Sequence, residues 1–89
     1  MTTFIELRDE AGWHDDEEQW IDAEKVDSFV IFPDPVPAFR ATRARAGLPE
    51  VWTVQFRSAG RILGAATILG RDRAKRYALK VIHGQDMIV

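Results

Sequence analysis

A predicted β-hairpin between residues 51 and 69 limits what this chain can fold into more than any other feature. Residues 51–57 alternate, with one face formed by Trp52, Val54 and Phe56 and the other by Thr53, Gln55 and Arg57. This period of two predicts an antiparallel strand with one face in water. The turn residues Ser58-Ala59-Gly60-Arg61 follow, and residues 62–69 predict the returning strand. An antiparallel sheet is therefore the centre of the expected fold.

Three segments before the hairpin also carry a recognisable pattern. Residues 3–8 alternate, with Ile5 and Leu7 on one side, and predict a half-buried strand. The β-branched and aromatic run over residues 28–32 predicts a strand buried on both faces. Residues 22–25 are typical of a capped single turn, and for Trp20-Ile21 we favour packing in the core or at a hinge.

The C-terminal part predicts a helix. Apolar residues follow helical spacing over residues 71–82, and Gly84 is placed for a left-handed C-cap. The apolar positions are Ala74, Tyr77, Ala78, Val81 and Ile82. Residues 64–66 in the preceding strand are small, so we expect this helix to pack closely over them.

Together these elements predict an α+β fold. We expect a small twisted antiparallel sheet of about four strands, with a barrel-like curl as one alternative, and a C-terminal α-helix packed on one face. A length of 89 residues leaves room for one core, so residues 1–89 should form a single domain. Residues 33–49 hold all four prolines and predict a Pro/Arg-rich loop. A short helix over residues 38–46 stays open as an alternative, with Pro37 at its first position and Gly47 past its end.

The charges are separated by sign along the chain. Residues 1–34 hold eleven acidic residues against Arg8 and Lys25, a net charge of −9, whereas residues 35–89 hold ten basic residues against three acidic ones, a net charge of +7. Three interpretations stay open. The halves match within one fold, they match head-to-tail between copies, or the basic part binds another anionic partner.

Residues that catalysis and metal binding require are scarce. No cysteine is present, and the two histidines, His14 and His83, stand in an acidic stretch and in the last turn of the predicted helix. Phosphate-binding glycine loops and nucleophile motifs are absent. We therefore predict a protein that is not an enzyme, with no catalytic residue, metal site, cofactor or small-molecule substrate. The first residues do not resemble a secretion signal and no apolar run is long enough to span a bilayer, so we expect a cytoplasmic protein with no membrane partner.

The charged clusters supply the candidate binding residues. We predict a protein partner, or a second copy of the chain, bound through complementary charge. The basic contacts are Arg40, Arg43, Arg45, Arg71, Arg73 and Arg76, and the acidic and aromatic contacts are Trp13, Asp15, Asp16, Glu17 and Glu18. The same bases support an alternative, a nucleic-acid-binding accessory protein that uses the basic loop and the C-terminal helix to contact phosphates.

The second half of the chain resembles a known group of proteins. The segment Glu50-Val-Trp-Thr-Val-Gln-Phe, the hairpin after it and the helix Arg71-Asp-Arg-Ala-Lys-Arg-Tyr-Ala-Leu-Lys-Val-Ile look like small Arg- and Ala-rich accessory proteins of actinobacteria and their phages. The resemblance contains no diagnostic motif and transfers no functional residue. It implies a host-interaction or regulatory factor.

Overall fold

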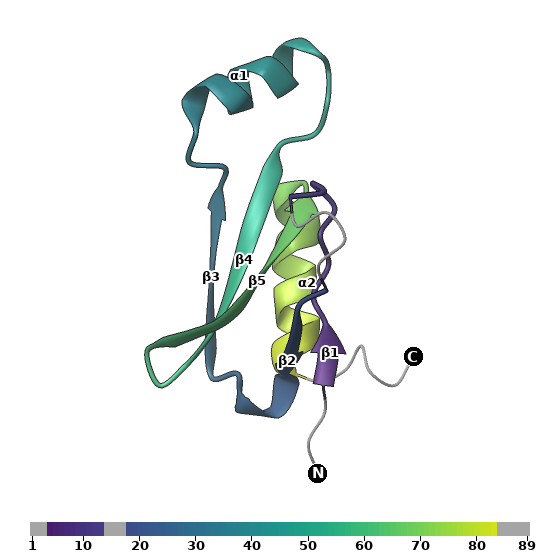
Figure 1. Cartoon of the computed structure of the whole chain (residues 1–89). Helices are drawn as coiled ribbons and strands as arrows, with labels where there is room; N and C mark the ends of the chain where they lie inside the picture. The colour runs from purple at the N-terminus through teal and green to yellow at the C-terminus, as the bar shows by residue number, and fades with distance from the viewer. Residues whose placement is uncertain (1–3, 14–17, 84–89) are drawn as a thin grey trace.

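The predicted hairpin is the centre of the fold in the computed structural model, which describes residues 4–13 and 18–83 (Figure 1). Strands β4 (Val51–Ser58) and β5 (Arg61–Leu69) pair in antiparallel fashion, and β3 (Ser28–Pro33) pairs antiparallel with β4. The strand order in this three-stranded sheet is β3-β4-β5. Ala59 and Gly60 form the turn with φ angles of 51° and 79°, the left-handed geometry that tight hairpins use.

A second, two-stranded sheet lies beside the first. It consists of β1 (Phe4–Glu6) and β2 (Trp20–Asp22), which pair antiparallel with Ile5 opposite Ile21. The chain that follows β1 then runs along β5, where Asp9 forms a parallel bridge with Thr67. The α+β class is confirmed, but the strands divide into two sheets and the described chain forms no closed barrel.

The short turn before β3 forms as expected. It is a 3-10 helix, η1 (Ala23–Lys25), in which the backbone N–H of Glu24 donates to the carboxylate of the N-cap residue Asp22 at 3.1 Å. Ala23 and, just after the turn, Val26 are buried. A side-chain cap of this kind replaces the hydrogen bonds that a single turn cannot make for itself.

Burial of β3 on both faces was a wrong expectation. Because β4 occupies the centre of the sheet, β3 is an edge strand, and none of its residues is fully buried. Phe29 and Ile31 pack against the core, whereas Val30 is 40% exposed on the other face. A run of apolar residues without charges therefore does not by itself place a strand in the middle of a sheet.

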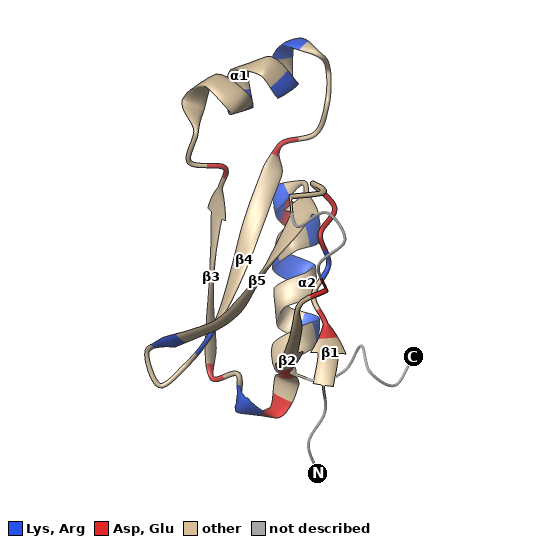
Figure 2. Ribbon diagram, viewed as in Figure 1, with Lys and Arg blue, Asp and Glu red and all other residues tan. Residues whose placement is uncertain are grey.

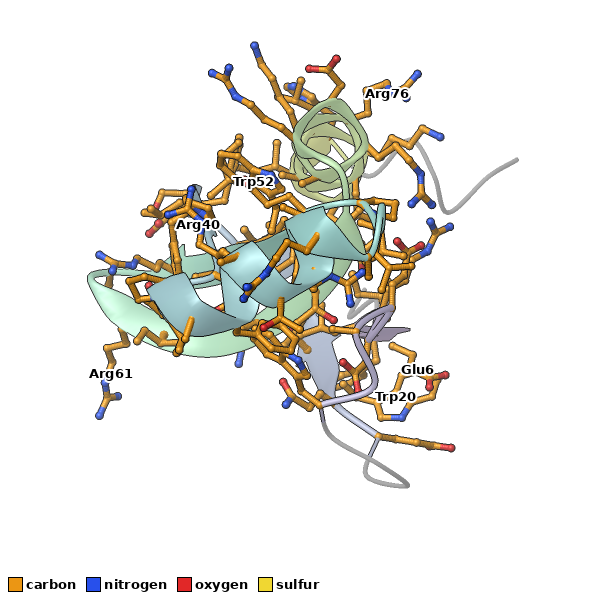
Figure 3. The ribbon with its side chains drawn as sticks, turned by 90° about the horizontal axis from the view of Figure 1, so that it is seen from above. Glu6, Trp20, Arg40, Trp52, Arg61 and Arg76 are labelled. Carbon is orange, nitrogen blue, oxygen red and sulfur yellow. The ribbon has the colours of Figure 1, made fainter. Side chains whose placement is uncertain are left out.

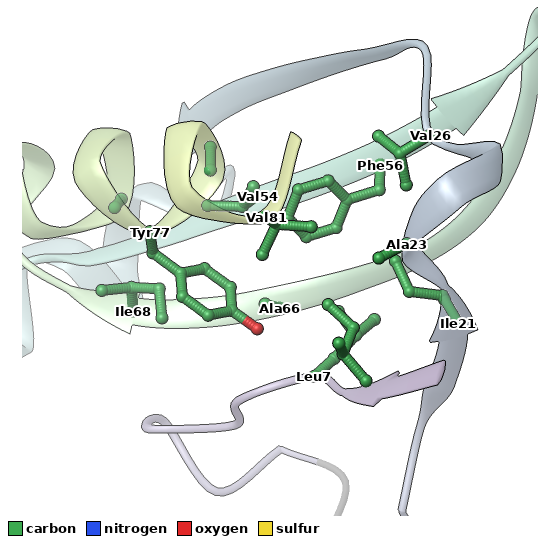
Figure 4. Close-up of a cluster of buried hydrophobic side chains, with 13 residues drawn as sticks. Leu7, Ile21, Ala23, Val26, Val54, Phe56, Ala66, Ile68, Tyr77 and Val81 are labelled. Carbon is green, nitrogen blue, oxygen red and sulfur yellow. The ribbon is translucent and has the colours of Figure 1, made fainter. Parts of the chain in front are cut away.

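The C-terminal helix α2 (Arg71–His83) covers the sheet face that carries Val54 and Phe56 (Figure 4). Its buried residues are Ala74, Tyr77, Ala78 and Val81, as the helical spacing predicts. Ala74 and Ala78 are completely buried, so their small side chains let the helix backbone approach the sheet closely. The predicted C-cap, Gly84, lies outside the described residues.

The N-terminal hairpin, which consists of β1, β2 and the residues next to them, packs over Gly64, and α2 does not. A Cβ atom at Gly64 would lie 2.7 Å from Cδ1 of Leu7 and 2.9 Å from Cγ2 of Ile21. Ala66, two residues further along, is buried in the core cluster that α2 joins. The small residues of β5 thus allow two elements to pack closely, the N-terminal hairpin and α2. The sequence predicted only α2.

Between β3 and β4 the chain forms an arm, residues 35–50, that extends beyond the end of the sheet (Figure 1). It contains helix α1 (Pro37–Arg45), with Pro37 in the first turn and Gly47 at a φ of 72° past its end. A loop throughout this segment was therefore the wrong alternative, because the residues between Pro37 and Gly47 favour a helix. No residue of α1 is buried.

None of the helices in the described part of the chain combines the length and the apolar character that a membrane span requires.

Candidate functional site

Four cationic side chains gather around one cavity of about 200 Å³ between α2 and the segment after β1. We call this cavity the basic groove. Its lining residues are Arg8, Ile68, Arg73, Arg76, Tyr77 and Lys80. Figure 2 shows the basic residues of α2 beside the acidic N-terminal segment.

The helical period explains why three of these cations share one side of α2. The buried stripe of α2 faces the sheet, and residues 73, 76 and 80 lie along one flank of that stripe. Arg8 arrives from the N-terminal segment, where Leu7 points inward and is buried and Arg8 points outward. Ile68 and Tyr77 are both nearly buried and form the apolar floor of the groove.

Arg8 is held against Tyr77. Its guanidinium carbon lies 5.3 Å from the centre of the tyrosine ring, and its backbone N–H donates to the tyrosine hydroxyl at 3.3 Å. A guanidinium over an aromatic face is attracted by the ring, and its N–H donors lie in its own plane and stay available at the edge. Arg8 is therefore oriented for contact with an anion.

One carboxylate of the same chain enters the basic cluster. Glu10 accepts from Nη1 and Nη2 of Arg73 at 2.7 and 2.8 Å, and its Oε1 also accepts from the backbone N–H of Leu69 at 2.8 Å. The Arg73 hydrogen bonds lower the pKa of Glu10 against the opposing effect of burial, and the Leu69 amide lowers it further. This pair joins the acidic and basic parts of the chain, so the sign separation is partly matched within the fold.

An acidic surface with exposed aromatic rings lies next to the groove. In the β1–β2 sheet Ile5 and Ile21 point inward, so Phe4, Glu6, Trp20 and Asp22 point outward. Phe4 is 63% and Trp20 54% exposed, and the indole N–H of Trp20 donates to Glu18. We call these five residues (Phe4, Glu6, Glu18, Trp20 and Asp22) the acidic surface. A cavity of about 340 Å³ at its border is lined by Phe4, Glu6, Trp20, Arg8 and Tyr77, among others.

The structure separates the six predicted basic contacts. Arg73 and Arg76 line the basic groove, and Arg71 at the start of α2 lies over the Trp52 ring at 6.0 Å. The other three belong to the arm. Figure 3 shows Arg40 and Arg76 pointing to different sides of the molecule, so the two clusters do not form one continuous surface.

In the arm, most of the predicted contacts have partners within the chain. Arg40 lies 3.7 Å from a carboxylate oxygen of Glu50, and the Nε of Arg43 donates to the Pro49 carbonyl at 2.9 Å. Trp13 packs against Phe39 of α1 with ring centres 6.0 Å apart. Arg45 is exposed on α1.

The predicted acidic contacts are only partly described. Asp15, Asp16 and Glu17 lie outside the described residues, whereas Glu18 is exposed and accepts from Trp20. Of the pair Trp20-Ile21, for which core or hinge packing was expected, Ile21 lies in the core. A core position is wrong for Trp20, which is 54% exposed because Ile21 takes the inward-facing place in β2.

Sequence reasoning missed Arg8, Lys80, Phe4, Glu6 and Trp20 as surface residues of the site. For Lys80 a signal existed, because residues 73, 76 and 80 follow the helical period. For Phe4, Glu6 and Arg8 the alternation over residues 3–8 predicts an outward-facing side, but it does not predict that this side borders α2. No signal marked Trp20, because the pairing of so short a strand depends on tertiary structure.

The residues of the described part contain no group of three His, Cys, Asp or Glu side chains arranged to hold a metal ion. Comparisons with protein families, with curated proteins and with solved structures gave no match to this chain. The candidate site is therefore defined by its geometry and charge alone: a small α+β domain with a basic groove beside an acidic aromatic surface.

Proposed function

We propose that this protein is a small non-enzymatic interaction module that binds an acidic segment of a protein in the basic groove. The observation that carries the proposal is the convergence of Arg8, Arg73, Arg76 and Lys80, from two separate segments, on one open cavity. Glu10 pairs with Arg73, and its carboxylate also interacts electrostatically with Arg8. An anionic partner would gain charge-assisted hydrogen bonds from the cations that line the cavity.

The size of the groove favours a peptide segment over a large ligand. Its volume of about 200 Å³ is below the range of roughly 300–1,000 Å³ that small-molecule sites occupy. The groove therefore fits a few carboxylate side chains of an extended or helical segment. Exposed charges of this kind mainly raise the association rate and make binding sensitive to salt.

The groove is less suited to nucleic acid, which is the alternative function. Single-stranded binders stack bases on exposed aromatic rings, whereas Tyr77 in the groove is only 7% exposed. Moreover, the arm arginines and the groove arginines do not track one phosphate backbone, since Arg40 and Arg76 point to different sides (Figure 3).

Titration of a labelled Glu-rich peptide tests the proposal. We expect binding at low salt that weakens as the ionic strength rises, and an increase in Kd of about five- to tenfold for Arg76→Glu, which replaces an attraction by a repulsion. Arg61→Glu is the matched control, because it changes the net charge equally at the exposed start of β5. Equal weakening by both variants would contradict a role for the groove. Duplex DNA and single-stranded RNA are titrated in parallel, and tighter binding of either than of the peptide supports the alternative.

A further inference from the structure

The groove and the acidic surface are neighbours on one side of the molecule. Arg8 and Tyr77 line both cavities, so these two residues form the border between them. Figure 3 shows Glu6 and Trp20 together at the lower right and Arg76 at the upper right, all three away from Arg61 at the left. A cationic cavity and an anionic aromatic patch thus lie side by side, which makes this side of the protein complementary to itself.

We infer that two copies of this chain form a dimer about a two-fold axis at the border, with the acidic surface of each copy against the basic groove of the other. The inference rests on the proposed function, because it names the acidic segment that the groove binds. A two-fold axis uses one patch on both copies, so each favourable contact occurs twice. Carboxylates such as Glu6 then face Arg8 and Arg76 of the second copy.

The exposed aromatic rings favour a protein occupant of this surface. Phe4 and Trp20 leave 63% and 54% of their surface in water, the two most exposed aromatic rings of the described chain. Buried aromatic residues with a charged rim are typical of the energetic centre of protein interfaces. Burial of these rings in the dimer would supply the apolar contact that charge pairs alone lack.

Charge complementarity favours a second copy over an unrelated protein. The acidic surface carries Glu6, Glu18 and Asp22 with no cation among its five residues, and the groove carries four cations. Every molecule carries one acidic surface and one basic groove. The head-to-tail alternative would join the same two surfaces in an open row of copies, whereas the inferred two-fold pair is closed.

Sedimentation of the full chain over a range of concentrations tests the inference. We expect a monomer–dimer equilibrium that weakens with salt and stops at two chains. Glu6→Arg and Arg76→Glu should each shift it toward monomer by about tenfold in Kd, because each reverses a charge in both symmetric contacts. Arg61→Glu should leave it unchanged.

Mixing the two variants is the sharpest measurement. In a two-fold dimer of one Glu6→Arg chain and one Arg76→Glu chain, both contacts regain opposite charges, so the mixture should dimerise about as well as the wild type. The double variant Glu6→Arg/Arg76→Glu should do the same. No rescue in either case, or species larger than two chains, would overturn the two-fold arrangement.

The Glu6→Arg variant also separates the two proposals. Its basic groove is intact and has lost its occupant, so the labelled acidic peptide should bind it more tightly than it binds the wild type. A wild-type protein that stays monomeric while the peptide binds overturns the dimer and leaves the proposed function standing. A peptide that binds neither protein overturns the proposed function.

Discussion

Gly64 determines how closely the N-terminal hairpin approaches the sheet. The position it leaves open is bounded by Leu7 and Ile21, two of the buried residues that join the hairpin to the core. The absence of a side chain here is thus a packing requirement and not a matter of backbone conformation.

Replacing Gly64 by alanine should destabilise the protein by about 1–3 kcal/mol, because the added Cβ overlaps Leu7 and Ile21 and both are fixed by their neighbours. Chemical denaturation gives the free energy of unfolding. Ala65→Ser, on the other face of β5, is the control and should change it by less than about 0.5 kcal/mol. A neutral Gly64→Ala variant would show that the hairpin can move away from β5.

Glu10 should make stability depend on pH. Its pKa is lowered in the fold by the Arg73 hydrogen bonds, so the stabilisation is complete above the ordinary glutamate pKa and is lost as the pH falls through the lowered value. Glu10→Gln should therefore be less stable than the wild type near neutral pH, and the difference should shrink in acid. Asp27 also has a lowered pKa, but it is present in both proteins and cancels in the comparison.

Urea unfolding of both proteins from neutral to acidic pH measures this difference. Added salt should reduce it at neutral pH, since half of the Arg73 side chain is exposed. A difference that stays constant with pH would contradict the role of the carboxylate charge.

Among the elements, the arm is the one least tied to the core. No residue of α1 is buried, and the strands that carry the arm are already joined at its base, where the Asp34 N–H donates to the Val51 carbonyl at 3.0 Å. This nine-residue helix packs against little else. Its ends are set by Pro37 and Gly47, and the contact between Phe39 and Trp13 holds it in place.

Replacing residues 35–50 by Asn-Gly should keep the fold. The hydrogen-bonded pair Asp34 and Val51 suits a two-residue turn with positive φ angles, and we expect the free energy of unfolding to change by no more than about 1 kcal/mol. Circular dichroism and denaturation give the result. Loss of the cooperative transition would mean that the arm supports the sheet.

The secondary structure could largely be predicted from local patterns. Strands β4 and β5 and helix α2 are long enough for their periods to be unambiguous, and Asp22 marks the turn η1. The short strand β2 and the edge position of β3 were not predictable, because both depend on which segments pair across the fold. The candidate site is predictable to the same extent. Its part on α2 follows from helical spacing, whereas Arg8, Phe4 and Trp20 come next to α2 only through tertiary structure.

At the scale of the whole molecule, the core is assembled from both ends of the chain. Ile5, Leu7, Ile21 and Val26 share one cluster with residues of β4, β5 and α2. The acidic and basic parts of the sequence are therefore not separate units, and neither is expected to fold alone.

A fragment that lacks residues 1–26 should not unfold cooperatively. The fragment loses Ala23 and four larger apolar side chains from the core. Burial of each of the four larger ones contributes about 1.5–3 kcal/mol, a total close to the roughly 5–15 kcal/mol that keeps a typical domain folded. Thermal denaturation followed by circular dichroism, with the full chain as the reference, measures this. A sharp transition in the fragment would show that β3, β4, β5 and α2 form an independent unit.

The hydrogen bond that closes the base of the arm has a consequence for how this protein can change over generations. The ends of the arm are tied to the fold, because Val36 donates to Asp34 and the Glu50 carbonyl accepts from Gly70. Between these ends the strand pairing does not depend on the arm, so we expect the fold to tolerate substitutions, insertions and deletions there. Natural selection on the sequence of the arm then acts mainly on the contacts that the arm makes, and only weakly on the stability of the protein. The arm is thus a region in which new surface can arise without loss of the scaffold that presents it.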